Sequence, residues 1–226
     1  MGGTSVFLFS FGLPAIGATA AWLATWASWK EVKAELGPNT RYKDESTPRA
    51  RLMVFLVLPG TLLLFGYSAY VLISGRLGEI PDSILDWCAL AFGIPGMLTG
   101  FGEAIVYRRG VAASFRHPSE RGRVITLSVL PETAALFGFA TSFLLLGLAG
   151  SFAGPPAVLA DAARNSVLFV SLGAIGAPVT AVLPMTAYDY QTQSTFLRGV
   201  KRSVGGTSMM AVGFLLAYLA MAPLIA

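Results

Sequence analysis

The chain has 226 residues, of which 54% are hydrophobic and 12% are charged, and its formal net charge is +4. Soluble domains carry about 25% charged residues, so this composition excludes an ordinary soluble domain and indicates a membrane protein. The positive charge does not indicate nucleic-acid binding, because no basic patch is interleaved with aromatic residues.

Six apolar segments follow one another along the chain. A transmembrane helix needs about 20 predominantly apolar residues, and the segments that meet this requirement are 4–29, 50–74, 83–107, 123–149, 164–188 and 204–226. We expect the first segment to be a span and not a signal peptide, because no basic residues precede it. The predicted fold class is an all-α membrane protein of six transmembrane helices, arranged as three tandem antiparallel hairpins.

The basic residues are distributed unequally between the two sides of these spans. Fourteen of the 16 lysines and arginines flank or fill the first, third and fifth loops, and only Arg76 and Arg164 fall on the other side. Cytoplasmic loops of membrane proteins carry an excess of basic residues. The pattern therefore predicts that loops 30–49, 108–122 and 189–203 are cytoplasmic and that both termini lie outside.

The sequence contains an internal repeat. Residues 51–67 match residues 123–139 at an offset of 72, sharing Arg, Val-Leu-Pro, Thr and Leu-Phe-Gly at the same places. The helices that precede them share Phe-Gly-x-Pro at 11–14 and 92–95, at an offset of 81. A further Gly-x-Pro at 176–178 hints at a third copy. Repeats of this kind indicate that one supersecondary unit is used several times.

The repeat unit is predicted to be a hairpin, and the three copies differ at one key position of the second helix. This position holds Gly60, Glu132 and, in a loose third alignment, Thr207. Only the second copy has an acid there. The predicted units are an acid-free hairpin at 1–76, a hairpin with this glutamate at 77–155, and a diverged hairpin at 156–226.

Two acids, Glu103 and Glu132, lie inside predicted spans, where ionisable residues are costly and usually functional. Glu132 lies nine residues beyond Arg123, roughly 13 Å along a helix and near the middle of the apolar core. A fold-back about residues 117–118 brings both acids to the same height. Two facing carboxyls in a low dielectric do not both ionise cheaply, so we expect one to hold a proton or the pair to share a cation.

At these residues the sequence resembles the proteolipid subunit, called c or K, of V-type and archaeal A-type rotary ATPases. The resemblance rests on Val-Leu-Pro-Glu-Thr-Ala-Ala-Leu-Phe-Gly-Phe at 129–139, on Leu-Thr-Gly-Phe-Gly-Glu at 98–103 and on Leu-Pro-Gly-Thr at 58–61. It implies that Glu132 is the ion carrier, and that a leucine carbonyl and a threonine hydroxyl help to coordinate the ion. The ion-binding set implied by the resemblance is Glu132, Glu103, Thr61, Leu58 and Thr99.

The resemblance also implies partners and a mode of action. We expect copies of the chain to form a ring in lipid that turns against a stator membrane subunit and contacts a central stalk. No nucleophile–base pair, phosphate-binding loop or metal cluster is visible. The expected role is therefore a non-catalytic, ion-translocating subunit without a cofactor, whose transported ion is H⁺ or Na⁺.

Three residues depart from the sodium-binding members of the family. Leu62 stands where glutamine is frequent, Phe65 lacks the hydroxyl of a frequent tyrosine, and Glu103 replaces an amide with an acid. Fewer neutral oxygen ligands favour a proton, while a second carboxylate still permits sodium at the same residues. Two other classes stay open, a non-rotary transporter or channel and a structural proteolipid homologue. The parallel orientation of the repeats disfavours a transporter built from inverted repeats.

Overall fold

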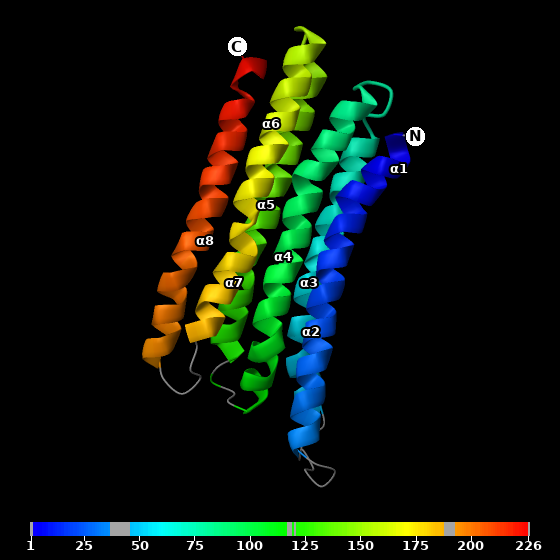
Figure 1. Cartoon of the computed structure of the whole chain (residues 1–226). Coiled ribbons are helices and arrows are strands. Elements are labelled where there is room, and N and C mark those ends of the chain that lie inside the picture. Colours follow the sequence, from blue (N-terminus) through cyan, green and yellow to red (C-terminus); the bar gives the residue numbers. More distant parts are fainter. Residues whose placement is uncertain (1, 37–45, 117–118, 120, 188–192, 226) are drawn as a thin grey trace.

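The protein is a bundle of long helices in the structure, a computed structural model that describes residues 2–36, 46–116, 119, 121–187 and 193–225 (Figure 1). Six of the described helices are long and apolar enough to cross a membrane. The all-α fold with six transmembrane helices is thus confirmed, and the chain is an integral membrane protein. The spans are Gly3–Ala34, Leu52–Ser74, Asp82–Arg116, Arg121–Ser151, Pro156–Val182 and Gly199–Leu224.

The second, third and fourth spans are single helices, whereas the first, fifth and sixth are built from more than one element. The first joins α1 (Gly2–Phe7), the π-helical turn η1 (Leu8–Gly12) and α2 (Leu13–Leu36). The fifth joins α6 (Pro156–Ala174) and α7 (Gly176–Ala187). The remaining elements are α3 (Ser46–Ser74), α4 (Asp82–Arg116), α5 (Arg121–Ser151), α8 (Gln193–Ala220) and the 3₁₀ turn η3 (Ala222–Leu224).

The fifth span begins at Pro156, eight residues before the predicted start at 164. The prediction placed the boundary at Arg164, after the charged residue Asp161. In the structure these two side chains form an ion pair of 3.1 Å within one turn of α6, with both side chains mainly exposed. Because opposite charges three residues apart support a helix, α6 continues through them.

The helices form two layers, with α4 at the centre of the first. In this layer α4 packs between α2 on one side and α6 and α7 on the other, and the second layer contains α3, α5 and α8. The first and last described helical turns lie at the same end of the bundle (Figure 1). α2 packs more extensively on α4 than on α3. The division into tandem hairpins at 1–76, 77–155 and 156–226 therefore remains a prediction.

Glycines allow α2 and α4 to approach each other closely. A Cβ atom built on Gly17 would lie 2.6 Å from the carbonyl oxygen of Met97, and one on Gly100 would overlap the backbone of Gly17. Small residues of this kind let transmembrane helices pack backbone against backbone. The first layer is held together by these contacts, and the Ala21 side chain beside them is fully buried.

Two glycines pack in the same way, each against a backbone carbonyl that has lost its helical hydrogen bond because a proline follows four residues later. Proline has no backbone N–H, so Pro14 and Pro95 leave the carbonyls four residues before them, those of Ser10 and Ala91, without their usual helical partner. A Cβ on Gly66 would lie 2.8 Å from the Ser10 oxygen. A Cβ on Gly138 would lie 2.8 Å from the Ala91 oxygen. The contact recurs at the offsets of 72 and 81 residues found in the sequence.

The last two spans pack differently. A Cβ on Gly213 would lie 2.7 Å from the carbonyl oxygen of Phe169. The carbonyl that lies four residues before Pro178 is that of Ala174, so Gly213 contacts a different turn of the helix from the one that the repeat predicts. The third copy of the repeat does not reproduce the contact of the first two, and the alignment of Thr207 with Glu132 stays a prediction.

The α2–α4 contact can be tested with a matched pair of glycine substitutions. We expect Gly100→Ala to lower the free energy of unfolding by about 1–3 kcal/mol, because its methyl group overlaps the α2 backbone. Gly147→Ala is the control, since a Cβ there meets nothing within 4 Å, and its effect is expected to stay within about 0.5 kcal/mol. Unfolding of the detergent-purified protein, followed by circular dichroism, measures both. Equal stability of the two variants would contradict the contact.

Candidate functional site

Helices α4 and α5 are joined at mid-span by one hydrogen bond and one close contact. The Thr99 hydroxyl donates to the Pro131 carbonyl oxygen at 3.0 Å, and Thr99 is fully buried. Three residues further along α4, a Cβ on Gly102 would lie 2.8 Å from the Pro131 ring. Since Glu103 follows Gly102 and Glu132 follows Pro131, this contact brings the two acids together.

The two carboxyl groups are neighbours that differ in exposure. Glu103 is 0% exposed, and among the described residues neither of its carboxyl oxygens has a hydrogen-bond partner. Glu132 is partly exposed, and its Oε1 atom is buried without a partner among the same residues. The two groups interact electrostatically. The prediction that the fold-back brings Glu103 beside Glu132 agrees with this geometry, although residues 117–118 lie outside the described residues.

Glu132 lies at the boundary between the bundle interior and its outer surface. Val129 and Leu136, three residues before and four after, are 44% and 52% exposed. Positions at this spacing share one face of a helix. In an integral membrane protein such a stripe of exposed apolar side chains contacts lipid or a neighbouring protein. One carboxyl of the pair is therefore enclosed by protein, while the other is within reach of the surface.

The pair is suited to hold one monovalent cation. In the described part of the chain, it belongs to no group of three or more acids, histidines and cysteines. Leaving two adjacent carboxylates charged inside a bilayer is costly, so the pair must take up positive charge. One bound proton or one sodium ion lowers the charge from −2 to −1 and gives the carboxyl oxygens the partner that they otherwise lack.

Thr61 and Leu58 lie on α3 and bond to each other. The Thr61 hydroxyl donates to the Leu58 carbonyl oxygen at 2.6 Å, within the same helix. The Leu58 side chain packs into the apolar cluster that contains Leu130 of α5. Among the described residues, no hydrogen bond joins Thr61 or Leu58 to Glu132. Their roles as ion ligands remain predictions, as do those of Glu132, Glu103 and Thr99.

Two polar residues beside the pair were not predicted. Tyr107 follows Glu103 by one turn of α4 and is fully buried, and Ser128 precedes Glu132 by one turn of α5 and is also fully buried. The tyrosine hydroxyl interacts electrostatically with both carboxyls, and the Ser128 side chain is its neighbour. The signal was present in the sequence, because Thr99, Glu103 and Tyr107 recur at a spacing of four residues and thus share one face of a helix.

The fifth span closes one flank of the site. A Cβ on Gly102 would lie 3.0 Å from the carbonyl oxygen of Ala177, on α7. Ala177 also packs in a small apolar cluster with Ala134 of α5 and Met210 of α8. The last third of the chain is thereby built into the wall of the carboxyl site. On the opposite flank, α3 contributes Phe55, whose ring packs against Tyr107.

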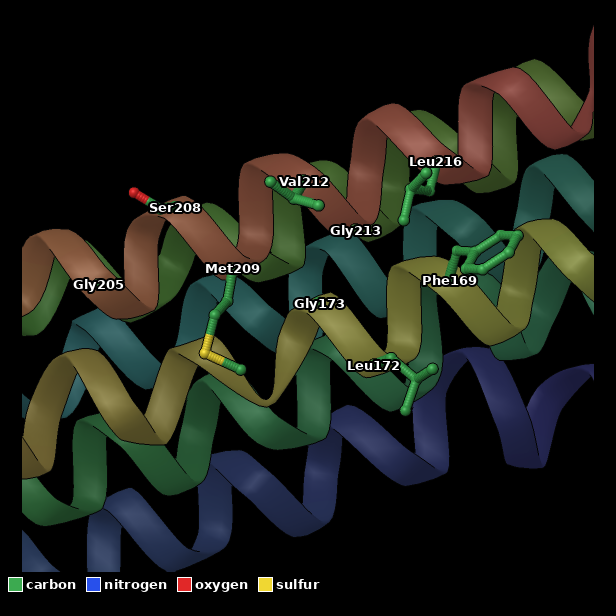
Figure 2. Close-up of a pocket in the computed structure, with 9 residues that line it drawn as sticks. All are labelled: Phe169, Leu172, Gly173, Gly205, Ser208, Met209, Val212, Gly213 and Leu216. Carbon is green, nitrogen blue, oxygen red and sulfur yellow. The ribbon is translucent and has the colours of Figure 1, made fainter.

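An apolar groove lies away from the carboxyl pair, and its lining is not suited to bind an ion. An open groove of about 460 Å³ runs between α6 and α8 (Figure 2). Among the described residues that line it, only Ser208 has a side-chain hydroxyl and none has a carboxyl. The lining residues are Phe169, Leu172, Gly173, Gly205, Ser208, Met209, Val212, Gly213 and Leu216. This groove is suited to apolar contacts, whereas the ionisable pair lies between α4 and α5.

Comparison with known proteins identifies relatives of the region that carries the pair. The ATP synthase C-subunit family matches residues 87–145, which contain both Glu103 and Glu132. Over part of its length, the chain is similar to rotary ATPase proteolipid subunits. It is 30% identical over 108 residues to the K subunit of the A-type ATP synthase of Methanocaldococcus jannaschii, a match that covers 46% of this chain and 48% of that subunit. It is 22% identical over 149 residues to the 16 kDa proteolipid subunit c of the V-type proton ATPase of Nephrops norvegicus. This match covers 63% of this chain and 94% of that subunit.

These matches confirm the resemblance to V-type and A-type proteolipid subunits that the sequence indicates. The match spans about half the length of the archaeal relative. No solved structure matches the chain significantly. The family match covers most of α4 and most of α5, and it excludes the first two spans and the last two. The part of the chain that resembles the family is therefore the part that carries the carboxyl pair.

The α4–α5 hydrogen bond can be tested by removing its donor. We expect Thr99→Val to lower the free energy of unfolding by about 0.5–1.5 kcal/mol, since the buried Pro131 carbonyl loses its side-chain partner. Thr126→Val is the control, because the Thr126 hydroxyl is exposed and bonds only within its own helix. Denaturant unfolding in detergent measures both changes. A Thr99→Val protein as stable as the control would show that this bond does not hold α4 against α5.

Proposed function

We propose that this chain is the rotor-ring subunit of a V-type or A-type rotary ATPase or ATP synthase, and that Glu132 carries the transported ion. The observation that carries the proposal is the Glu103–Glu132 pair, which lies inside a membrane span, has one enclosed and one surface-facing carboxyl, and falls in the segment that matches the ATP synthase C-subunit family. The function follows from the cost of a bare carboxylate in lipid. Glu132 travels past lipid only in its neutral or ion-paired form.

In the proposed ion cycle, Glu132 and Glu103 have different roles. Glu132 accepts an ion from one half-channel of a stator subunit, moves with the ring and releases the ion to the other half-channel. Glu103 stays enclosed and shares the charge of the bound ion. We propose a proton as the ion, because the departures at Leu62 and Phe65 remove neutral ligand groups that sodium would use. The cytoplasmic ends of α4 and α5, from Arg116 to Arg123, face the central stalk in this arrangement.

Each chain supplies one ion carrier for six membrane spans. The key position holds an acid in the second unit, whereas Gly60 occupies it in the first and a Cβ there would meet nothing within 4 Å. In the third unit the residue aligned with it is Thr207, whose hydroxyl bonds to Ser203 of its own helix at 3.2 Å. A ring of such chains moves fewer ions per turn than a ring of the same size with an acid in every hairpin. This lowers the ratio of ions to ATP and suits pumping against a steep gradient.

Three variants of the complex in sealed vesicles test the carrier. ATP-driven acidification should be lost in Glu132→Gln, to below about a hundredth of wild type, because the amide binds no proton. Glu103→Gln should keep measurable transport, since Glu132 remains. Glu79→Gln is the control, because Glu79 is an exposed acid that pairs with Arg76 outside the spans, and its transport should equal wild type.

The outcomes separate the alternatives. Full transport by Glu132→Gln would exclude the carrier role and leave a structural proteolipid homologue. ATP-driven sodium uptake in place of acidification would show that Na⁺ is the ion. Ion flux that needs neither ATP nor a rotary complex, with the purified chain alone in vesicles, would favour a channel or transporter.

A further inference from the structure

The hydroxyl of Tyr107 is a buried polar group that the ion cycle described above does not use. The side chain is 0% exposed, in the middle of the bundle. Among the described residues, its hydroxyl has no hydrogen-bond partner. Buried hydroxyl groups nearly always have a partner, because an unpaired one costs free energy. The position of Tyr107, one turn from Glu103, indicates that its partner belongs to the ion site.

The packing around Tyr107 holds the phenol ring toward the carboxyl pair. Side chains in a helix lean toward its N-terminus, so Tyr107 leans over the turn that carries Glu103. From α3, the ring of Phe55 packs edge-on against Tyr107, with the ring centroids 5.4 Å apart and the planes at 72°. This contact keeps the ring in place. The ring is therefore held one turn from Glu103, with its hydroxyl buried and unpaired among the described residues.

Ser128 offers the tyrosine hydroxyl a second acceptor. Its own hydroxyl donates to the Ile125 carbonyl oxygen at 2.8 Å, which leaves the serine oxygen free to accept a hydrogen bond. The Ser128 side chain is a neighbour of the Tyr107 hydroxyl. A small movement of the Tyr107 side chain can thus bring its hydroxyl to a neutral acceptor on α5 or to a carboxyl on α4, neither of which it bonds in the structure.

We propose that Tyr107 is a positioning residue of the Glu103–Glu132 site, and that its hydroxyl turns from Ser128 to Glu103 when the site releases its ion. This inference rests on the proposed function and deepens it. A hydrogen bond to a charged acceptor is stronger than one to a neutral acceptor, so Tyr107 stabilises the vacated, charged site more than the loaded site. The acidic group that neighbours Glu103 from α5 is Glu132. Because the bond to the charged carboxyl is the stronger one, the tyrosine favours ion release.

The test compares Tyr107→Phe with wild type in carbodiimide labelling. The full-length protein in detergent, free of sodium, is treated with a lipophilic carbodiimide across a range of pH, and labelling of Glu132 is quantified by peptide mapping. Wild-type labelling should fall as pH rises, because the reagent reacts with protonated carboxyls. In Tyr107→Phe the midpoint should move about one pH unit higher, since the charged site loses a donor. The ring and its contact with Phe55 remain.

Two further variants make the result specific. Tyr218→Phe removes a hydroxyl from an exposed tyrosine of α8, and its midpoint should match wild type. Ser128→Ala removes the acceptor of the loaded state, so its midpoint should move lower by roughly half a pH unit. Opposite shifts at two neighbouring residues do not follow from a loss of packing. Ser128→Ala also tests the proposal independently if Tyr107→Phe does not fold.

The outcomes distinguish this inference from the function on which it rests. Unchanged midpoints in Tyr107→Phe and Ser128→Ala, with normal wild-type labelling, would overturn the role of Tyr107 and leave the ion carrier intact. Shifts of both variants in the same direction would also overturn it. A wild-type protein in which Glu132 is never labelled would overturn the proposed function itself.

Discussion

The carboxyl group of Glu103 determines the rest of the site, because it is fully buried in a membrane span without a basic partner among the described residues. A bilayer core excludes water, and a second carboxyl lies beside Glu103, so charge on the pair must be balanced by a bound ion. The neighbouring helices serve this requirement. α5 is held by the bond from Thr99 to Pro131, α7 closes one flank at Gly102, and α3 closes the other with Phe55. Glu132 remains the only carboxyl of the pair that approaches the surface.

Glycine and proline make this enclosure possible. Close approach of α2 to α4 at Gly17 and Gly100 excludes lipid from the first layer. Pro14 and Pro95 each leave one backbone carbonyl without its helical hydrogen bond, and Gly66 and Gly138 of the second layer pack against these carbonyls. The same contact therefore occurs in the first two units of the repeat. The last two spans use their own glycine contacts and leave an apolar groove between α6 and α8. They wall the site through Ala177 and add no acid at the key position. Under the proposed function, the last two spans therefore enlarge the subunit without adding a second ion carrier.

Several features could be predicted from the sequence because they depend on local rules. Hydropathy and length predict the six spans, and the positions of Glu103 and Glu132 about the fold-back predict that they meet. The predicted start of the fifth span was wrong, because a hydropathy scan does not account for the ion pair between Asp161 and Arg164. The preference of α2 for α4 over α3 depends on backbone contacts between distant glycines, which no local pattern encodes. The place of Tyr107 in the site follows from a four-residue spacing, but its contact with Phe55 requires the tertiary structure.

The central claim is that each chain holds one exchangeable ion, at Glu132, in a pair with Glu103. Intact-mass spectrometry of the detergent-purified chain after exhaustive reaction with a lipophilic carbodiimide tests it most directly, because each reacted carboxyl adds one fixed mass. One adduct per chain, mapped to Glu132 and absent from the Glu132→Gln variant, is the predicted result. A chain without an adduct, or a chain with adducts on both Glu103 and Glu132, would contradict a single carrier site.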